Sequence, residues 1–441
     1  MRLRPGWVAL ALLLLALAGG ITLLSLLRAS PEEVWSEVSA RTPGELVRYL
    51  KRRLEHHGKL EAVFVPALDW VQRKFERPVD LASIPTLGKG QRVQAGVAAV
   101  SALDLYVSTV EELREAMRVA TAGRTIILAP GTYKVSQRLR TGNGGTAAQP
   151  IVIRPAERGT VWMSVTATMG IRMTQPYWVV EGLNWRGECT SHDDCEHALQ
   201  IVGEAHHVTV RDNLMQDFNA HIKVNGENGV FPDHGRIVFN SLNNSAPRNT
   251  LRSVVPIDIV AASGWQVSDN VINDFIKSGG NRTSFGAFMK GAGSGGRFER
   301  NLVVCTSRGI SQPGTRVGIS LGGGGTGLPS CRDGRCVTEH EDGIVQDNVV
   351  AHCNDSGIDI NTAARSVVRH NTLINTAGIQ LRGDPTSATV TGNLLDGHIG
   401  IRPGSTLDES GNLKVDTREV FRDADGLDLA WLGARQPAGA R

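Results

Sequence analysis

The sequence predicts an all-β protein whose main domain is a parallel β-helix, and two repeated patterns carry this prediction. In the first, an asparagine follows a short β-like run, as in "VTVRDNL" and "SVVRHNTL". Successive asparagines are 27, 30, 31, 47, 23 and 22 residues apart, which indicates bare turns of about 22 residues and longer turns that contain inserted loops. The asparagines are Asn213, Asn240, Asn270, Asn301, Asn348, Asn371 and Asn393.

The second pattern is a five-residue segment that recurs within each turn. Its second and fourth positions are mostly apolar, whereas its third and fifth positions are often polar. This alternation predicts strands with one face toward a core and one toward solvent. Parallel stacking at a spacing of about 4.8 Å then forms a β-helix. The asparagines would form a ladder of side-chain amides along it. The segments are HIKVN at 221, PIDIV at 256, GAFMK at 286, GISLG at 318, GIDIN at 357, GIQLR at 378 and GIRPG at 400.

Composition and charge favour a turn-rich globular protein over a fibrous or disordered one. The chain has 50 glycines among 441 residues and only 5% aromatic residues. Its formal net charge of +3 is small and its arginines are scattered, so nucleic acid is not an expected partner.

Residues 1–29 are predicted to be a transmembrane anchor or a signal peptide. The apolar run from Trp7 to Leu27 is long enough to cross a bilayer, and Arg2 and Arg4 would stay on the cytoplasmic side. The alternative is cleavage after the small residues near Ala18. Both interpretations export the chain, either to a position on the inner membrane facing the periplasm or into the medium.

Three further regions follow. Residues 30–84 are predicted to be a helical stalk, since Ser30 and Thr42 each begin a capping box with proline at the first helical position. Residues 85–104 have the composition of a linker, and residues 105–441 form the β-helix domain. We expect a capped helix over 110–120 and a first strand over 125–128, with the segment 419–432 closing the far end.

All six cysteines lie between Cys189 and Cys353, and export would permit disulfides. Two pairs are close enough in sequence to staple loops, namely Cys189 with Cys195 and Cys331 with Cys336. For Cys305 and Cys353, either a bridge between neighbouring turns or two buried thiols is expected.

Three segments carry a resemblance to a known family. "AGRTIILAPGTYKV", "GTAAQPIVIRPAERGTVWM" and "NVINDFIKSGGNRTSFGAFMKGAGSGGRFERNLV" resemble the chondroitinase B and alginate lyase group, polysaccharide lyases of family six. The resemblance spans about residues 105–430 and implies a right-handed parallel β-helix. It also implies β-elimination on uronic-acid polysaccharides, with Lys290 as the base and Asn301 in the following strand.

Two departures from the family pattern affect the expected site. Where the family has an assisting arginine, this chain has Gly322, and the segment "NRTSFGAF" before Lys290 lacks the family's calcium-binding carboxylates. We therefore expect a calcium site only if Asp258 and Asn225, on preceding turns, act as oxygen ligands.

Stacking of the five-residue segments predicts two outward columns of residues. The third positions place Lys223, Asp258, Phe288, Ser320 and Asp359 in one column. The fifth positions place Asn225, Val260, Lys290, Gly322, Asn361 and Arg382 in the other. The predicted catalytic residue is Lys290. The predicted substrate-binding residues are Lys223, Asn225, Asp258, Ser320, Asp359, Asn361 and Arg382.

The sequence thus predicts an exported, membrane-tethered β-helix protein that acts on an acidic polysaccharide, with elimination as the expected reaction if it is an enzyme. The alternatives are a non-catalytic polysaccharide-binding or scaffold protein of the cell envelope and a uronate epimerase. The segment "TEHEDG" adds His340, Glu341 and Asp342 as further candidate acids or bases.

Overall fold

The computed structural model describes Val47, Leu50, Lys51, Leu54 and residues 58–75, 78–81 and 104–433, except 311, 313 and 324. The chain divides into two compact units, Met1–Val71 and Gln72–Arg441.

The first unit contains most of helix α4 (Gly58–Phe75), which lies within the region predicted to be helical. Lys51 forms an ion pair with Asp69 of this helix. The predicted anchor at 1–29 and most of the predicted linker at 85–104 lie outside the described residues. Among the helices that are described, none is long and apolar enough to span a membrane.

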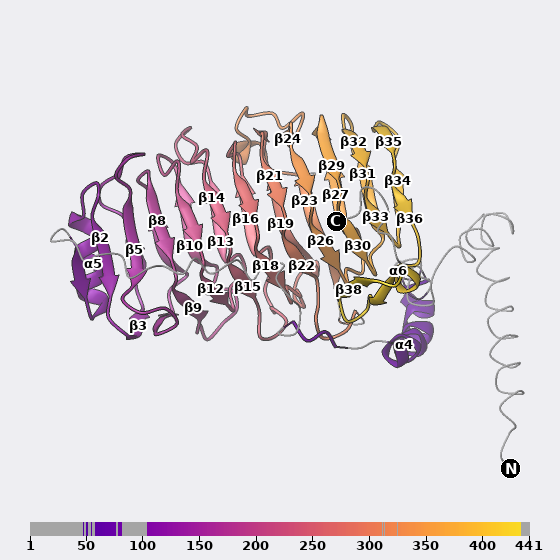
Figure 1. Cartoon of the computed structure of the whole chain (residues 1–441), viewed down its shortest axis with the longest axis horizontal. Coiled ribbons are helices and arrows are strands. Elements are labelled where there is room, and N and C mark those ends of the chain that lie inside the picture. Colours follow the sequence, from indigo (N-terminus) through magenta and orange to yellow (C-terminus); the bar gives the residue numbers. More distant parts are fainter. Residues whose placement is uncertain are drawn as a thin grey trace, which may run out of the picture. The chain divides into compact units, whose positions relative to one another are not determined.

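Most of the second unit is a right-handed parallel β-helix, as predicted, with three long parallel sheets (Figure 1). We call these sheets A, B and C. The 12 strands of sheet A are β1 (Leu105–Val107), β2 (Thr125–Leu128), β5 (Ile151–Pro155), β8 (Trp178–Glu181), β11 (Thr209–Arg211), β14 (Arg236–Val238), β17 (Gln266–Ser268), β21 (Arg297–Glu299), β25 (Ile344–Gln346), β29 (Ser366–Arg369), β32 (Ser387–Thr391) and β35 (Thr406–Ser410).

Sheets B and C follow sheet A within each turn. The 11 strands of sheet B are β3 (Gly131–Val135), β6 (Val161–Val165), β9 (Asn184–Gly187), β12 (Leu214–Gln216), β15 (Ser241–Asn243), β18 (Val271–Asn273), β22 (Leu302–Val304), β26 (Val349–Ala351), β30 (Thr372–Ile374), β33 (Leu394–Leu395) and β36 (Leu413–Lys414). The 10 strands of sheet C are β4 (Leu139–Arg140), β7 (Met169–Met173), β10 (His197–Val202), β13 (Ile222–Asn225), β16 (Ile257–Val260), β19 (Thr283–Lys290), β23 (Thr315–Gly322), β27 (Ile358–Asn361), β31 (Gly378–Arg382) and β34 (His398–Ile401).

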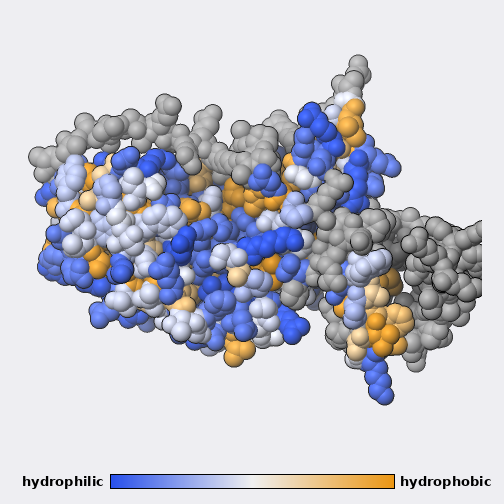
Figure 2. Space-filling view, turned by 90° about the horizontal axis from the view of Figure 1, so that it is seen from below, coloured by the Kyte–Doolittle hydropathy of each residue, from blue (hydrophilic) through white to orange (hydrophobic). Residues whose placement is uncertain are grey.

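The core is a continuous apolar column inside the three sheets. Trp178, Trp185, Trp265 and Phe298 are among its fully buried side chains. Outward positions are largely polar, and Figure 2 shows a mostly hydrophilic surface with scattered hydrophobic groups on the face that it presents. This inside-out alternation is what the period of two in the repeated segments predicts.

Helix α5 (Val110–Val119) covers the first turns of the solenoid, as expected. Its N-terminus is a capping box in which the Thr109 hydroxyl accepts a hydrogen bond from the Glu112 backbone N–H at 3.1 Å. Leu113 and Met117 are fully buried on its inner face. The helix therefore keeps the first core layer out of water.

The predicted asparagine ladder is confirmed. Each Nδ2 donates to the Oδ1 of the asparagine in the next turn at 2.9–3.0 Å, from Asn213 through Asn393. The same Oδ1 accepts the backbone N–H of the preceding asparagine at 2.9–3.1 Å. An eighth rung that the sequence analysis did not identify, Asn412, ends the ladder.

The ladder occupies the corner between sheets A and B, where the chain turns sharply. The residue before every ladder asparagine has a positive φ, between 53° and 63°. Only two of these eight residues are glycines, although the left-handed conformation costs other residues about 1 kcal/mol each. The residues are Asp212, Phe239, Asp269, Arg300, Asp347, His370, Gly392 and Gly411.

The register of sheet C agrees with the two predicted outward columns. Lys223 pairs with Asp258, which pairs with Phe288. In the second column, Val260 pairs with Lys290. Further along the sheet, Ser320 pairs with Asp359, Gly322 with Asn361, and Asn361 with Arg382.

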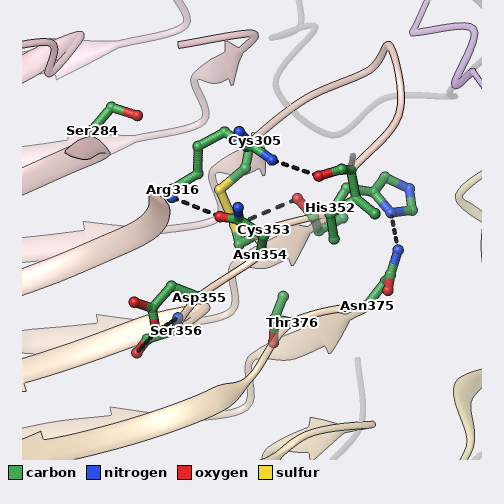
Figure 3. The surroundings of a disulfide bond; sticks show 12 residues. Ser284, Cys305, Arg316, His352, Cys353, Asn354, Asp355, Ser356, Asn375 and Thr376 are labelled. Atoms are coloured by element: carbon green, nitrogen blue, oxygen red, sulfur yellow. Dashed lines mark hydrogen bonds between the residues drawn. A yellow bond between two sulfur atoms is a disulfide. The ribbon is translucent and has the colours of Figure 1, made fainter. Parts of the chain in front are cut away.

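Three disulfides form. Cys189–Cys195 and Cys331–Cys336 close short loops, as expected from their spacing. Cys305–Cys353 links the ends of the paired strands β22 and β26, so of the two alternatives the bridge between turns is the one present (Figure 3). Close to this bridge, the buried Arg316 donates to the carbonyls of Ile310 and Gln312 and orders the segment before β23.

The C-terminal segment differs from its prediction. Helix α6 (Thr417–Val420) leads into an antiparallel hairpin of β37 (Phe421–Asp423) and β38 (Asp428–Trp431). Phe421 and Leu427 pack with Val304 and Ala351, which belong to sheet B and not to the interior column. The hairpin therefore covers the outer side of sheet B instead of closing the far end, because the outward residues of β22 and β26 are apolar.

The ladder predicts a difference between inner and terminal rungs. Asn270→Ala should lower the free energy of unfolding by about 3 kcal/mol, because the buried Asn240 N–H groups lose their acceptor. Asn412→Ala should cost less than about 1 kcal/mol, because its rung is partly exposed and water can replace the amide. Urea unfolding of both variants measures this, and equal losses would contradict a cooperative ladder.

Candidate functional site

A groove of about 810 Å³ lies over four consecutive strands of sheet C, β10, β13, β16 and β19. Two loops at the carboxyl ends of the strands form its side, residues 226–231 after β13 and residues 325–334 after β23. At a strand spacing of about 4.8 Å, four strands span enough length for several sugar residues.

Lys290 lies in this groove at the end of β19. Its Nζ is 4.7 Å from the ring centre of Phe288, which is a cation–π distance. Close packing with Gly323 fixes its stem, since a Cβ at Gly323 would lie 2.8 Å from the Lys290 Cδ. Within the described part of the chain, the side chain of Lys290 has no hydrogen bond and no ion pair; its backbone carbonyl accepts the Ala261 N–H at 2.8 Å.

The other charged residues of the groove are paired. Lys223 donates to Asp258 at 2.8 Å, and Asp258 is almost completely buried. Glu196 pairs with Arg252 at 3.2 Å, and Glu227 pairs with Arg172. Opposite charges therefore cancel within the groove, and the ammonium of Lys290 remains as its uncompensated charge.

The two residues considered for calcium do not fit a calcium site. The Asp258 carboxylate accepts the Lys223 ammonium, and the Asn225 Oδ1 accepts the Gln200 amide at 3.2 Å. No group of three or more His, Cys, Asp or Glu side chains is placed to hold a metal ion in the described residues. Calcium usually takes six to eight oxygen ligands, so this pair does not supply a site.

The remaining predicted substrate-binding residues lie outside the groove, on β23, β27 and β31. Ser320 is fully buried and donates to the Gly322 carbonyl at 2.7 Å. The carboxylate of Asp359 is also buried, and Arg382 donates to both of its oxygens at 2.7 and 2.9 Å. Burial raises the pKa of Asp359, although the Arg382 guanidinium opposes this shift. Asn361 accepts from the Thr362 hydroxyl at 3.3 Å. These residues contact one another or their own backbone.

Two groove residues that were not among the predicted site residues, Glu196 and His197, come from the turn of β10. The corner in that turn lacks a ladder asparagine, because Leu183 occupies the position, and the repeated pattern is recognisable only from Asn213 onward. The available signal was the apolar alternation of Leu199 and Ile201, which pair in register with β13.

His197 is a neutral histidine at the floor of the groove. Its Nδ1 lies 3.0 Å from the Ala220 carbonyl, which only accepts, so Nδ1 carries the proton and Nε2 has a lone pair. Burial lowers the pKa of His197, and the neighbouring Lys223 ammonium lowers it further. The Nε2 of His197 lies 3.6 Å from Oε2 of Glu196.

His340, a candidate acid or base from the sequence, does not reach the groove. It belongs to β24 (His340–Glu341), the middle strand of a small sheet with β20 (Gly293–Ser294) and β28 (Ala363–Ala364). Its ring is fully buried, and neither ring nitrogen has a hydrogen-bond partner among the residues that the structure describes. Burial lowers its pKa to about 4. Glu341 and Asp342 instead pair with Arg365 on the surface.

Comparison with known families agrees with this fold. The chondroitinase B family model matches residues 107–283 and ends before Lys290. The chain is a polysaccharide lyase-like parallel β-helix. A second family model, the periplasmic copper-binding protein NosD, matches residues 326–415. A comparison with curated proteins finds no match.

Several solved structures are similar to this chain. An alginate lyase from Paenibacillus sp. is 17% identical, with 70% of this chain and 95% of that chain covered and a TM-score of 0.43. A polysaccharide lyase of family six from Pseudopedobacter saltans is 14% identical, with 76% and 97% covered and a TM-score of 0.37. A lacto-N-biosidase from Eubacterium ramulus is 11% identical, with 71% and 68% covered and a TM-score of 0.49. At these identities the activities of the three proteins do not transfer to this chain.

The buried His340 predicts a pH-dependent stability. Its folded-state pKa of about 4 lies below the ordinary value of 6.5, so the unfolded chain binds the proton first as the pH falls. Stability is complete above pH 6.5 and is lost as the pH falls toward 4. From pH 7 to pH 5 this histidine should account for a loss of about 2 kcal/mol.

His340→Leu should therefore reduce the difference in unfolding free energy between pH 7 and pH 5 by that amount. The exposed His234, replaced by glutamine, is the matched control. An unchanged difference in His340→Leu would show that the histidine is protonated in the folded protein.

Proposed function

We propose that the groove binds an uronic-acid polysaccharide and that Lys290 removes a proton in a β-elimination. The observation that carries the proposal is the Lys290 ammonium, which has no compensating carboxylate among the described residues and faces an extended groove. An anionic polymer would supply the missing negative charge. Because successive turns of sheet C would contact successive sugars, the groove is suited to a polysaccharide and not to a small ligand.

Lys290 carries out one step of the proposed reaction. As the free amine, its Nζ takes the proton from the carbon that bears the carboxylate, and the released electron pair forms a carbon–carbon double bond. The bond to the glycosidic oxygen breaks, and that oxygen receives a proton from solvent. The Phe288 ring and Gly323 hold the lysine stem in one orientation, which reduces the entropy lost when substrate binds.

Export is part of the proposal. Three disulfides are typical of oxidising compartments, which supports a position outside the cytoplasm. We propose further that the apolar run from Trp7 to Leu27 keeps the protein on the inner membrane, facing the periplasm. The enzyme would then meet polysaccharide in the cell envelope.

The role of Lys290 is tested by Lys290→Arg. If Lys290 is the base, the variant should lose about 10²–10⁴-fold in kcat and still bind polymer, because arginine keeps its charge but does not give up its proton near neutral pH. Unsaturated ends formed from a panel of uronate polymers are followed by ultraviolet absorbance. The exposed Lys134, changed to arginine, is the matched control.

The alternatives give other outcomes. Equally fast cleavage by wild type and Lys290→Arg would eliminate lysine as the base. Binding without unsaturated product would favour a scaffold or binding protein. Exchange of the proton with solvent deuterium and inversion at that carbon, without chain cleavage, would favour an epimerase.

The anchor is tested by mass spectrometry of the mature chain from the membrane fraction. We expect peptides that include Trp7 to Leu27. A mature N-terminus near Gly19 would instead show a cleaved signal peptide.

A further inference from the structure

An inserted loop brings an arginine next to Lys290. The loop of residues 325–336, called here the arginine loop, follows β23 and folds back over sheet C. The Arg332 backbone N–H donates to the carbonyl of Gly291, the residue after Lys290, at 2.9 Å. The Cys331–Cys336 disulfide and the short helix η1 (Leu328–Ser330) shape the loop.

A buried carboxylate holds the base of the arginine loop. Glu339 is 2% exposed and accepts the backbone N–H groups of Gly325 and Thr326 at 2.9 and 2.8 Å. A charged acceptor makes such bonds strong, so the loop has a defined position above the groove.

The guanidinium of Arg332 is fixed by three groups. Nη1 and Nη2 donate to the two oxygens of Asp233 at 2.7 and 2.9 Å, and Nη1 also donates to the Ala261 carbonyl at 3.3 Å. The ring of Phe231 lies 4.5 Å from the guanidinium carbon. Asp233 is itself held by the Ser263 backbone N–H at 2.8 Å.

These contacts leave one edge of the guanidinium open. Arginine has five N–H donors. The contacts with Asp233 and Ala261 use both N–H groups of Nη1 and one N–H group of Nη2. The free donors are the Nε–H and the second Nη2–H, neither of which has a partner among the residues described. Together they form the side-on fork that binds a carboxylate with two hydrogen bonds. Arg332 lines the groove and is 33% exposed, so a ligand can reach this fork.

We infer that Arg332 binds the carboxylate of the sugar from which Lys290 removes the proton. The inference rests on the proposed function and adds a second residue to the same site. Proton removal beside a carboxylate moves negative charge onto its oxygens, and a fixed guanidinium stabilises that charge in the transition state. Asp233 is a positioning residue, because it holds Arg332 and does not touch the substrate. The substrate must then be a free acid and not a methyl ester.

The test compares acid and ester ligands. Binding of a uronate oligosaccharide and of its methyl ester is measured by calorimetry for wild type and Arg332→Gln. Wild type should bind the acid at least about tenfold more tightly, and the variant should lose most of this preference, because it lacks the fork and keeps only the attraction of the Lys290 ammonium. With a cleavable polymer, Arg332→Gln should lower kcat by about 100-fold or more. Arg332→Lys should recover only part of the acid preference, because lysine keeps the charge without the fork.

Two controls separate binding from loop disorder. Arg335→Gln removes a charge from the same disulfide loop, outside the groove, and should leave the acid preference unchanged. The double variant Arg332→Gln with Asp233→Asn leaves no unpaired carboxylate, so it should fold like wild type and lack the preference to the same extent as Arg332→Gln alone.

The outcomes distinguish this inference from the proposed function. Cleavage with an unchanged acid preference in Arg332→Gln would overturn the role of Arg332 and leave Lys290 as the base. An acid preference that depends on Arg332, without any cleavage, would overturn elimination and keep the carboxylate site. Equal binding of acid and ester by wild type, or no binding of either, would overturn the inference.

Discussion

The asparagine ladder is the interaction on which the other features of the solenoid depend. Each amide oxygen accepts two N–H groups from the preceding rung, and each amide nitrogen donates to the next. The corner residue before each asparagine has a left-handed conformation that most side chains avoid. The ladder compensates for this cost because it satisfies buried backbone donors that the sharp corner would leave without partners. It thereby sets the register of every strand that follows, including the register that places Lys290 beside Val260.

The repeating part of the fold was predictable because one physical requirement recurs in every turn. An asparagine at the corner and apolar residues at alternate strand positions are local features of the sequence, and stacking forces equivalent positions into columns. For that reason the pairings of Lys223 with Asp258 and of Asn361 with Arg382 followed from the sequence. The turns of β4, β7 and β10 were not identified, and leucine replaces the asparagine at position 183, in the turn of β10.

The site was less predictable, because its second half consists of insertions. The conformation of the arginine loop depends on a disulfide, on the buried Glu339 and on contacts with a loop three turns away. None of these features recurs at a regular spacing in the sequence, as the ladder asparagines do. The columns of outward residues also do not show how deeply each side chain is buried. Ser320 and Asp359 occupy the predicted column, yet both are fully buried, whereas Lys290 in the neighbouring column remains accessible. Side-chain pairing and loop cover decide that difference.

The ion pair between Arg332 and Asp233 joins residues that are 99 positions apart, from the loops after β23 and after β13. Solenoids change length in evolution by duplicating or deleting whole turns. A turn added between these two strands would move the loops apart by a strand spacing of about 4.8 Å, more than any hydrogen bond spans. The number of turns between β13 and β23 is therefore constrained, whereas the ends of the solenoid can lengthen or shorten. Relatives that keep the ion pair between Arg332 and Asp233 should have the same number of turns between β13 and β23. They should differ in the number of turns outside this segment and in the size of their loops.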